Sequence, residues 1–414
     1  MFLVRVFTNC APRNKQRSSL RIRSYLSSAP TMRHTHLVIT LSLFAVVSLW
    51  ITRSPLFGVF DSLTHWGAVQ LFLQGHDPYD FDALRALLSE RMKNVPLSQR
   101  IGGHPWTLTF MLPFYAWPFP LAKFLLAFTN LSVYHLCIVR LGKMWNPLPR
   151  FTPLLMWLYI PFLVAMYFGQ FSVFLALGTV LLLEWIQSEN RPWWKWTAAM
   201  ALLALKPQGF LVAAPLLGLE FLRTTSPTDR VRTIGVFALL AVISSPLLVF
   251  FPEWIASNHF SHDLRTATLS TYVREAAGFF GYDSPLWLWA LPALASGALL
   301  ARGVMITNAP TLLVVLLLSQ LTAPYIWVYD ACALMPLFYA LIGAIATMKE
   351  PRWRWHLGGI FASVAIFPIY LSIDSDFSFM VMHNVSMGIA TALVLPGVRE
   401  YLKNYSSPVS CSNN

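Results

Sequence analysis

Charged residues are scarce in this chain. Asp, Glu, Lys and Arg together make up 12% of its 414 residues, whereas a typical soluble domain carries about 25%. Hydrophobic residues make up 56% of the chain, and they occur in long runs. This composition excludes an ordinary soluble protein and predicts an integral membrane protein with most of its length in the bilayer.

Cysteine is also rare, and the four cysteines, Cys10, Cys137, Cys332 and Cys411, are scattered along the chain. Their spacing matches neither a zinc site nor a disulfide framework. The chain has neither a Walker motif nor a Rossmann glycine fingerprint, so nothing in it indicates a soluble nucleotide donor or coupling to ATP. We expect no cofactor and no bound metal.

Acidic residues are absent from the first 33 positions, which hold seven of the 30 basic residues. Other basic residues cluster in short loops between apolar runs. The net charge of +12 therefore follows the positive-inside rule rather than forming a nucleic-acid-binding patch. We predict that segment 1–36 is cytoplasmic, although its Arg and Ser content is also compatible with an organellar transit peptide.

Twelve apolar runs predict an all-α polytopic bundle, with both termini in the cytoplasm. A single transmembrane domain would cover residues 37–400, with long outer loops at 54–117 and 252–284 and a short cytoplasmic tail at 401–414. Several runs are shorter than the roughly 20 residues of a full crossing, so we expect kinked or broken helices. The predicted spans are 37–53, 118–140, 151–168, 170–187, 195–206, 207–222, 231–251, 285–301, 309–324, 326–347, 356–372 and 378–397.

Two parts of the first outer loop have a helical pattern without the length of a span. Residues 82–92 place Leu84, Leu87, Leu88 and Met92 on one face, which predicts an amphipathic helix lying on the membrane surface. The segment 104–117 is apolar and short, and a crossing there would invert the charge pattern that follows. We interpret it as a partial or interfacial helix.

Asp61 is the most informative residue, because it follows the first apolar run directly. An ionisable group at a membrane boundary is costly and therefore indicates a functional site, although a carboxylate that ends a helix and faces water would also fit. Gln170, Lys206 and Asp330 occupy corresponding positions at the predicted outer ends of other spans. This placement keeps the four groups close to the bilayer and would let them gather around one cavity.

Each of these residues also has a purely structural interpretation. Lys206 would reach the headgroups with its long side chain, but Pro207 breaks the helix beside it, and a cation at a helix break suits an anionic phosphate. Gln170 lies in a Gly-Gln turn that connects two spans or contacts a sugar hydroxyl. Asp330 would cap a helix N-terminus, and Tyr325 before it fits either an interfacial aromatic belt or a wall against a sugar ring.

The second outer loop holds His259, His262 and Asp263. Their spacing resembles that of metal ligands, but a fourth ligand at a recognisable distance is missing. A solvated loop or one that contacts phosphate is the better interpretation. Arg265 and Arg274 in the same loop are candidates for such a contact.

These residues together resemble glycosyltransferase family 87, the polyprenyl-phosphate-mannose-dependent mannosyltransferases of the GT-C superfamily. The resemblance covers residues 37–400 and rests on short motifs. Family members usually carry a Tyr-Pro-Pro-like element after the first loop, where this chain has His104-Pro105-Trp106. The matching elements are Asp61, Leu71 to Tyr79 with one residue fewer than usual before Gly75, Gly169-Gln170, Lys206-Pro207, and Thr322 to Asp330.

The resemblance implies an inverting transfer of mannose on the extracytoplasmic face of a bacterial plasma membrane. The partners would be a polyprenyl-phosphate sugar, which serves as co-substrate, and a glycolipid or glycan acceptor. Asp61 would be the general base, and Lys206, Arg265 and Arg274 would face the donor phosphate. The implied substrate contacts are His65, Tyr79, Gln170, Tyr325, Asp330 and His259.

Two other functions fit the same pattern. A polytopic transporter or lipid flippase also often has twelve spans, but such folds commonly contain internal repeats and place their functional charges near the bilayer midplane. We find no convincing repeat, and the polar residues gather at one predicted face. A non-catalytic subunit of an envelope-assembly complex is the third possibility.

Overall fold

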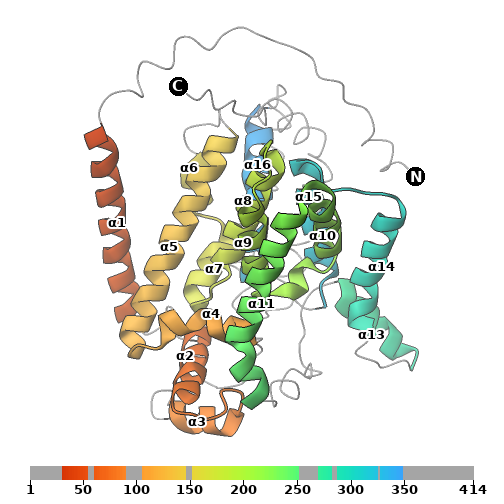
Figure 1. Cartoon of the computed structure of the whole chain (residues 1–414). Coiled ribbons are helices and arrows are strands. Elements are labelled where there is room, and N and C mark those ends of the chain that lie inside the picture. The colour runs from red at the N-terminus through yellow and green to blue at the C-terminus, as the bar shows by residue number, and fades with distance from the viewer. Residues whose placement is uncertain are drawn as a thin grey trace. The chain divides into compact units, whose positions relative to one another are not determined.

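The computed structural model describes residues 30–54, 60–89, 105–145, 152–250, 269–281, 287–324 and 327–347 (Figure 1). Every regular element in these ranges is a helix, which confirms the predicted all-α class. Contacts divide the chain into residues 1–46, which include the first part of helix α1 (Pro30–Arg53), and residues 47–414. The helices described below belong to the second unit unless stated.

Four helical segments of the described chain are long and apolar enough to cross a membrane. They are His36–Arg53 in α1, the whole of α5 (Phe119–Met144), Pro227–Leu247 in α11 (Pro227–Phe250), and Tyr329–Ala346. The last segment joins the 3-10 helix η3 (Val328–Leu334) to α16 (Met335–Thr347). These helices agree with an integral membrane protein. The predicted spans 356–372 and 378–397 lie outside the described residues.

The remaining helices are shorter, and proline accounts for many of their boundaries. The predicted span 151–168 is interrupted at Trp157–Tyr159, and the next helix starts with a proline in its first turn. The predicted span 195–206 ends before Pro207, in agreement with a broken helix. These helices are α6 (Thr152–Met156), α7 (Ile160–Phe168), α8 (Val173–Gln187), α9 (Trp193–Leu203), η2 (Pro207–Phe210), α10 (Ala213–Thr224), α13 (Leu269–Phe279), α14 (Trp287–Ala301) and α15 (Ala309–Thr322).

Helix α8 is the most deeply packed element, and it contacts α5, α9, η3, α15 and α16 (Figure 1). Nearly all of its residues are buried, as expected for a helix that is hydrophobic on every side. Gly178 allows α9 to approach closely, because a Cβ there would lie 3.0 Å from Leu203 and 3.1 Å from the carbonyl oxygen of Ala199. The α8–α9 pair therefore forms a fixed support for the turns at its ends.

The first predicted outer loop contains three helices, α2 (Phe60–Leu73), α3 (Phe81–Ser89) and α4 (Pro105–Tyr115). Helix α4 has 11 residues and is too short to cross a bilayer, as predicted for 104–117. Helix α2 was not predicted from the sequence. It packs against α3, α4, α5 and α7.

Helix α3 is amphipathic as predicted, but its apolar face has a different partner from the one expected. Leu84 and Leu88 are buried and pack over Gly67 of α2, where an added Cβ would lie 2.6 Å from Leu84. This face therefore contacts protein rather than lying on the membrane surface. Residues 90–92 of the predicted helix lie outside the described residues.

The Leu71 to Tyr79 motif forms the turn between α2 and α3. Gly75 has φ 80°, and the amide of His76 donates to the carbonyl of Leu71 at 2.9 Å, which is how a helix ends in a left-handed cap. Asp77 Oδ1 then accepts from the amide of Tyr79 at 2.8 Å. The motif thus fixes the angle between two helices.

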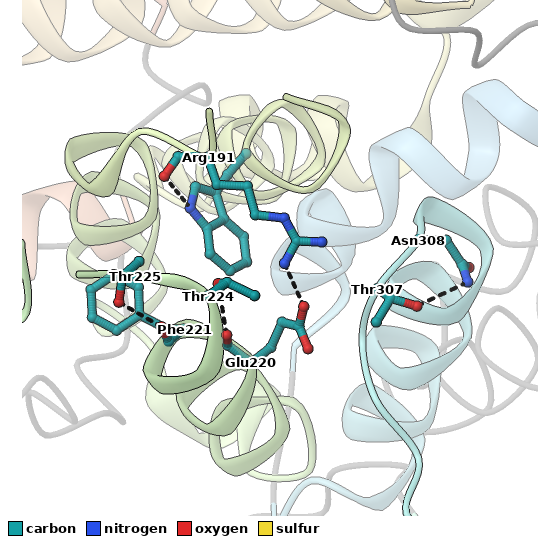
Figure 2. A network of polar contacts seen from close by, with 8 residues as sticks. Arg191, Glu220, Phe221, Thr224, Thr225, Thr307 and Asn308 are labelled. Atoms are coloured by element: carbon teal, nitrogen blue, oxygen red, sulfur yellow. Dashed lines mark hydrogen bonds and ion pairs between the residues drawn. The ribbon is translucent and has the colours of Figure 1, made fainter. Parts of the chain in front are cut away.

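Ion pairs connect the C-terminal ends of α8 and α10 and the N-terminal end of α9. Arg191 lies in the short connection after α8, pairs with the buried Glu220 of α10, and accepts a hydrogen bond at its carbonyl from Trp185 Nε1 (Figure 2). Its φ is 37°, an uncommon value for a residue other than glycine. Glu184 of α8 pairs with both Arg140 and Lys195. These contacts hold the α8–α9 hairpin in place.

Candidate functional site

Asp61 lies in the first turn of α2 and is partly exposed. A carboxylate at this position is favoured by the helix dipole. Its side chain also has partners from distant parts of the chain. Gln170 Nε2 donates to Asp61 Oδ2 at 2.5 Å, and Tyr329 also makes a side-chain hydrogen bond to Asp61. Residues separated by more than 100 positions therefore meet at this carboxylate.

Gln170 is held by the turn between α7 and α8. Gly169 ends α7 with φ 70° and ψ 42°, a left-handed conformation that suits glycine. The amide of Gln170 donates to the carbonyl of Ala165 at 2.8 Å, and Asn130 of α5 donates to the carbonyl of Gln170 at 2.8 Å. Because the backbone is fixed on both sides, the Gln170 side chain is directed at Asp61.

Lys206 and Asp330 form an ion pair, with Nζ 2.6 Å from Oδ1. The Lys206 ammonium also lies over the ring of Tyr329, 4.3 Å from its centroid, and 5.2 Å from that of Phe171. Both side chains are largely buried, so water and salt screen their attraction less than in a surface ion pair. The charge of this ammonium group also acts on the Asp61 carboxylate.

Two hydrogen bonds from α4 fix the chain just before Lys206. Trp106 Nε1 donates to the carbonyl of Ala204 at 2.6 Å, and the hydroxyl of Thr107 donates to that of Leu205 at 2.9 Å. These carbonyls lie where α9 ends, and Pro207 prevents the helix from continuing. The broken helix that the sequence predicted is therefore also anchored to the first loop.

Asp330 accepts hydrogen bonds from three donors. Besides Lys206, the hydroxyl of Ser172 donates to Oδ1 at 2.9 Å, and the amide of Trp327 donates to Oδ2 at 3.1 Å. The last bond ties Asp330 to the start of η3, so the predicted capping role is part of what the structure shows. Asp330 has the environment of a structural carboxylate, whereas Asp61 is partly exposed.

His65 lies one turn after Asp61 on α2 and therefore on the same face. Its ring stacks on Tyr115 at 6.4 Å and meets Phe171 edge-on at 5.9 Å. Burial, assisted by the charge of Lys206, lowers the pKa of His65 to about 3. The imidazole is therefore neutral at physiological pH and offers a hydrogen-bonding group without a charge.

The charges in the site oppose one another at Asp61. Burial raises the pKa of Asp61, whereas the hydrogen bond from Gln170 and the positive charge of Lys206 lower it. The negative charge of Asp330 acts in the same direction as burial. Asp61 is therefore more basic than an ordinary aspartate, and Lys206 limits this effect.

The structure brings together five of the residues selected from the sequence: Asp61, His65, Gln170, Lys206 and Asp330. The roles assigned to them remain predictions. We call these five residues, together with Ser172 and Tyr329, the Asp61 cluster.

Of the other selected residues, only Tyr79 and Arg274 lie in the described part of the chain. Tyr79 is buried in the turn after α2. Arg274 lies on α13, which is linked to α15 by the hydrogen bond from Ser270 to the carbonyl of Thr322. Tyr325, His259 and Arg265 lie outside the described residues, as do the other members of the predicted His-Asp group. Within the described ranges, no group of three or more His, Cys, Asp or Glu residues is placed to hold a metal ion.

Two residues were missed in the sequence: Ser172, which belongs to the Asp61 cluster, and Tyr115, which packs against it. Ser172 follows the Gly-Gln turn by two residues, and its polar side chain beside an apolar span was a usable signal. Tyr115 stacks on His65 from α4, and no local pattern distinguishes it from other aromatic residues of the membrane boundary. Tyr329 was considered only as an interfacial aromatic residue or a wall against a sugar.

Comparison with family models, with curated proteins and with solved structures finds no match for this chain. The resemblance to glycosyltransferase family 87 therefore rests on the sequence motifs given above, and the function rests on the chemistry of the site.

Proposed function

We propose that this protein is a membrane glycosyltransferase that moves a sugar from a polyprenyl-phosphate donor to an acceptor hydroxyl, with inversion at the anomeric carbon. The observation that carries the proposal is the convergence of three distant segments on Asp61, which contribute Gln170, Lys206, and Tyr329 with Asp330. A carboxylate that is partly exposed, made more basic by burial and held in place by Gln170 suits a general base.

The chain's own residues would divide the work as follows. Asp61 accepts the proton of the acceptor hydroxyl as the oxygen attacks the anomeric carbon. The bond between this carbon and the phosphate oxygen breaks, so the products are a glycoside, a polyprenyl phosphate and a protonated Asp61. Lys206 offsets the negative charge on the departing phosphate, and a neutral His65 is placed to hydrogen-bond a sugar hydroxyl.

The ion pair with Asp330 limits how Lys206 can act. Because its ammonium group has three donor hydrogens, Lys206 can remain bonded to Asp330 and still donate to a phosphate oxygen. Asp330 would then hold the cation in place without removing its charge from the site. The identity of the sugar as mannose follows from the family resemblance alone.

The proposal is tested by transfer of radiolabelled sugar from polyprenyl-phosphate-mannose to lipid extracts, in membranes that contain the wild type or Asp61→Asn. We expect transfer by the wild type and loss of transfer in the variant. Asp82→Asn serves as the matched control, because Asp82 is an exposed aspartate of the same outer segment. Its activity should equal that of the wild type.

A different result would favour the transporter or flippase. If the wild type transfers no sugar from any polyprenyl-phosphate donor and instead moves a labelled substrate across proteoliposomes, the proposal is wrong. A buried Lys-Asp pair next to a basic carboxylate would then serve to bind and release a proton or an ion during transport.

A further inference from the structure

Lys123 is a buried cation that the proposed reaction does not use. It is the fifth residue of α5, and only 4% of its surface is exposed. Lysine is almost never fully buried in proteins unless its charge is paired. A negatively charged partner for Lys123 is therefore expected.

The partner that the structure gives is neutral. Lys123 Nζ donates to the carbonyl oxygen of Ser54 at 2.7 Å. None of the ion pairs among the described residues includes Lys123. The sequence between Ser54 and Asp61 contains no acidic residue. Lys123 thus lacks a full negative charge to balance its own within the described chain.

The end of a helix supplies part of the balance. Ser54 directly follows α1, so its carbonyl is one of those at the helix end that have no hydrogen-bond donor within the helix. A helix C-terminus is equivalent to about half a negative elementary charge. This offsets only part of the charge of an ammonium group that has been removed from water.

An exposed tryptophan just before α5 favours a position of this helix end near the lipid headgroups. Trp117 precedes α5 and is half-exposed, and its carbonyl accepts a hydrogen bond from Trp66 Nε1 at 2.8 Å. Trp is enriched at the membrane interface. Lys123 lies about 6 Å along the helix from Phe119 at 1.5 Å per residue, within the depth of a headgroup layer.

We propose that Lys123 is the cation of a binding site for the phosphate of an anionic lipid at this end of α5. A charge-assisted bond from an ammonium group to a phosphate oxygen is among the stronger hydrogen bonds in proteins. Two of its three donor hydrogens remain for this bond while the third keeps the Ser54 carbonyl. The phosphate belongs either to the polyprenyl-phosphate donor or to an anionic phospholipid, and the site does not depend on the transferase activity.

The test measures lipid binding rather than catalysis. The purified full chain is titrated by native mass spectrometry with polyprenyl phosphate, polyprenol, phosphatidylglycerol and diacylglycerol. In the wild type, each phosphate-bearing lipid should bind more tightly than its phosphate-free counterpart. Because Lys206 is a separate proposed contact for the donor phosphate, the lipid bound by Lys123 is identified by the variant. A larger loss of affinity for polyprenyl phosphate in Lys123→Gln assigns the site to the lipid-linked donor, and a larger loss for phosphatidylglycerol assigns it to a phospholipid.

Three variants locate the effect. Lys123→Gln, which can keep a hydrogen bond to Ser54, should bind the phosphate-bearing lipids about tenfold more weakly, and Lys123→Arg should retain the affinity. Lys143→Gln is the control, because it removes an exposed cation near the other end of α5. If Lys123→Gln does not fold, Lys123→Met replaces it without burying a polar amide.

Two results would overturn the proposal. One is equal affinity of the wild type for lipids with and without phosphate, which requires no variant. The other is unchanged phosphate-lipid affinity in the folded Lys123→Gln protein. Either result would mean that Lys123 only caps the end of α1.

Discussion

At the scale of residues, the two aspartates of the cluster have different surroundings. Asp330 accepts hydrogen bonds from Ser172, Lys206 and Trp327, whereas Asp61 is partly exposed and is made more basic by burial. Two carboxylates in one site commonly take different roles when their environments differ. Here Asp330, with three donors, would position the cation, and the partly exposed Asp61 would react.

Lys206→Gln should move the pH dependence of transfer toward higher pH. If Asp61 is the general base, activity requires its ionised form and is lost as the pH falls through the pKa of that residue. The charge of Lys206 lowers the pKa of Asp61, and its removal therefore raises this pKa and shifts the acidic limb upward. The measurement is the initial rate of sugar transfer as a function of pH, from acidic to mildly basic buffers, for the wild type and the variant. If the acidic limb of the pH profile is the same in both proteins, the charge of Lys206 does not affect the pKa of Asp61.

His65 should make the folded protein sensitive to acid. The pKa of His65 is lowered to about 3 in the folded state, so the unfolded chain binds the additional proton between about pH 6.5 and 3. Stability from the neutral ring is present above pH 6.5 and is lost as the pH falls toward 3. His65→Phe retains an aromatic ring against Tyr115. It removes a difference of up to one bound proton between the folded and unfolded states, so the thermal midpoint of the variant should depend less steeply on pH. Identical profiles for both proteins would contradict this.

At the scale of elements, the turn between α7 and α8 directs Gln170 at Asp61. Gly169→Ala should destabilise this turn by about 1–2 kcal/mol, because alanine is strained in the left-handed region. We expect a lower thermal midpoint and a larger proportional loss of transfer. Gly218→Ala is the control, since Gly218 lies in helix α10 with open space at its Cβ position. This change should stabilise the helix slightly, and equal behaviour of the two variants would argue against the strained turn.

The ion pairs between α8, α9 and α10 should contribute unequally to stability. Glu220→Ala removes the partner of Arg191 at a site where Glu220 is buried (Figure 2), and we expect a cost of about 3 kcal/mol. Asp229→Ala breaks the exposed pair with Arg232 and should cost less than about 1 kcal/mol. Thermal unfolding of both variants in detergent provides the comparison. Similar losses of stability in the two variants would mean that the buried pair contributes no more than the exposed one.

The sequence predicted many helices but only some of their details. Apolar length located α5, α8, α11 and α15 to within a few residues. Helix α2 escaped prediction because its first turn is polar and it follows the first span after only a short gap. The face of α3 was predicted, but its contact with Gly67 of α2 was not, because helical periodicity does not identify the partner of an apolar face.

At the scale of the whole molecule, composition established a membrane protein, and four described helices are long and apolar enough to cross a bilayer. The gathering of Asp61, Gln170, Lys206 and Asp330 was expected from their positions at the ends of spans. Their individual contacts were not, because Asp61 and Gln170 are 109 positions apart and no local pattern encodes such a pairing. The twelve-span count and the GT-C fold remain predictions.

The measurement that most directly tests the central claim is the ratio of initial rates of sugar transfer by wild type and Asp61→Asn from a polyprenyl-phosphate donor. Both proteins would be purified, matched for thermal midpoint and reconstituted in the same lipid. If Asp61 is the general base, the ratio should be about 10²–10⁴. A ratio near one in the presence of measurable transfer would contradict the account and assign the chemistry to other residues.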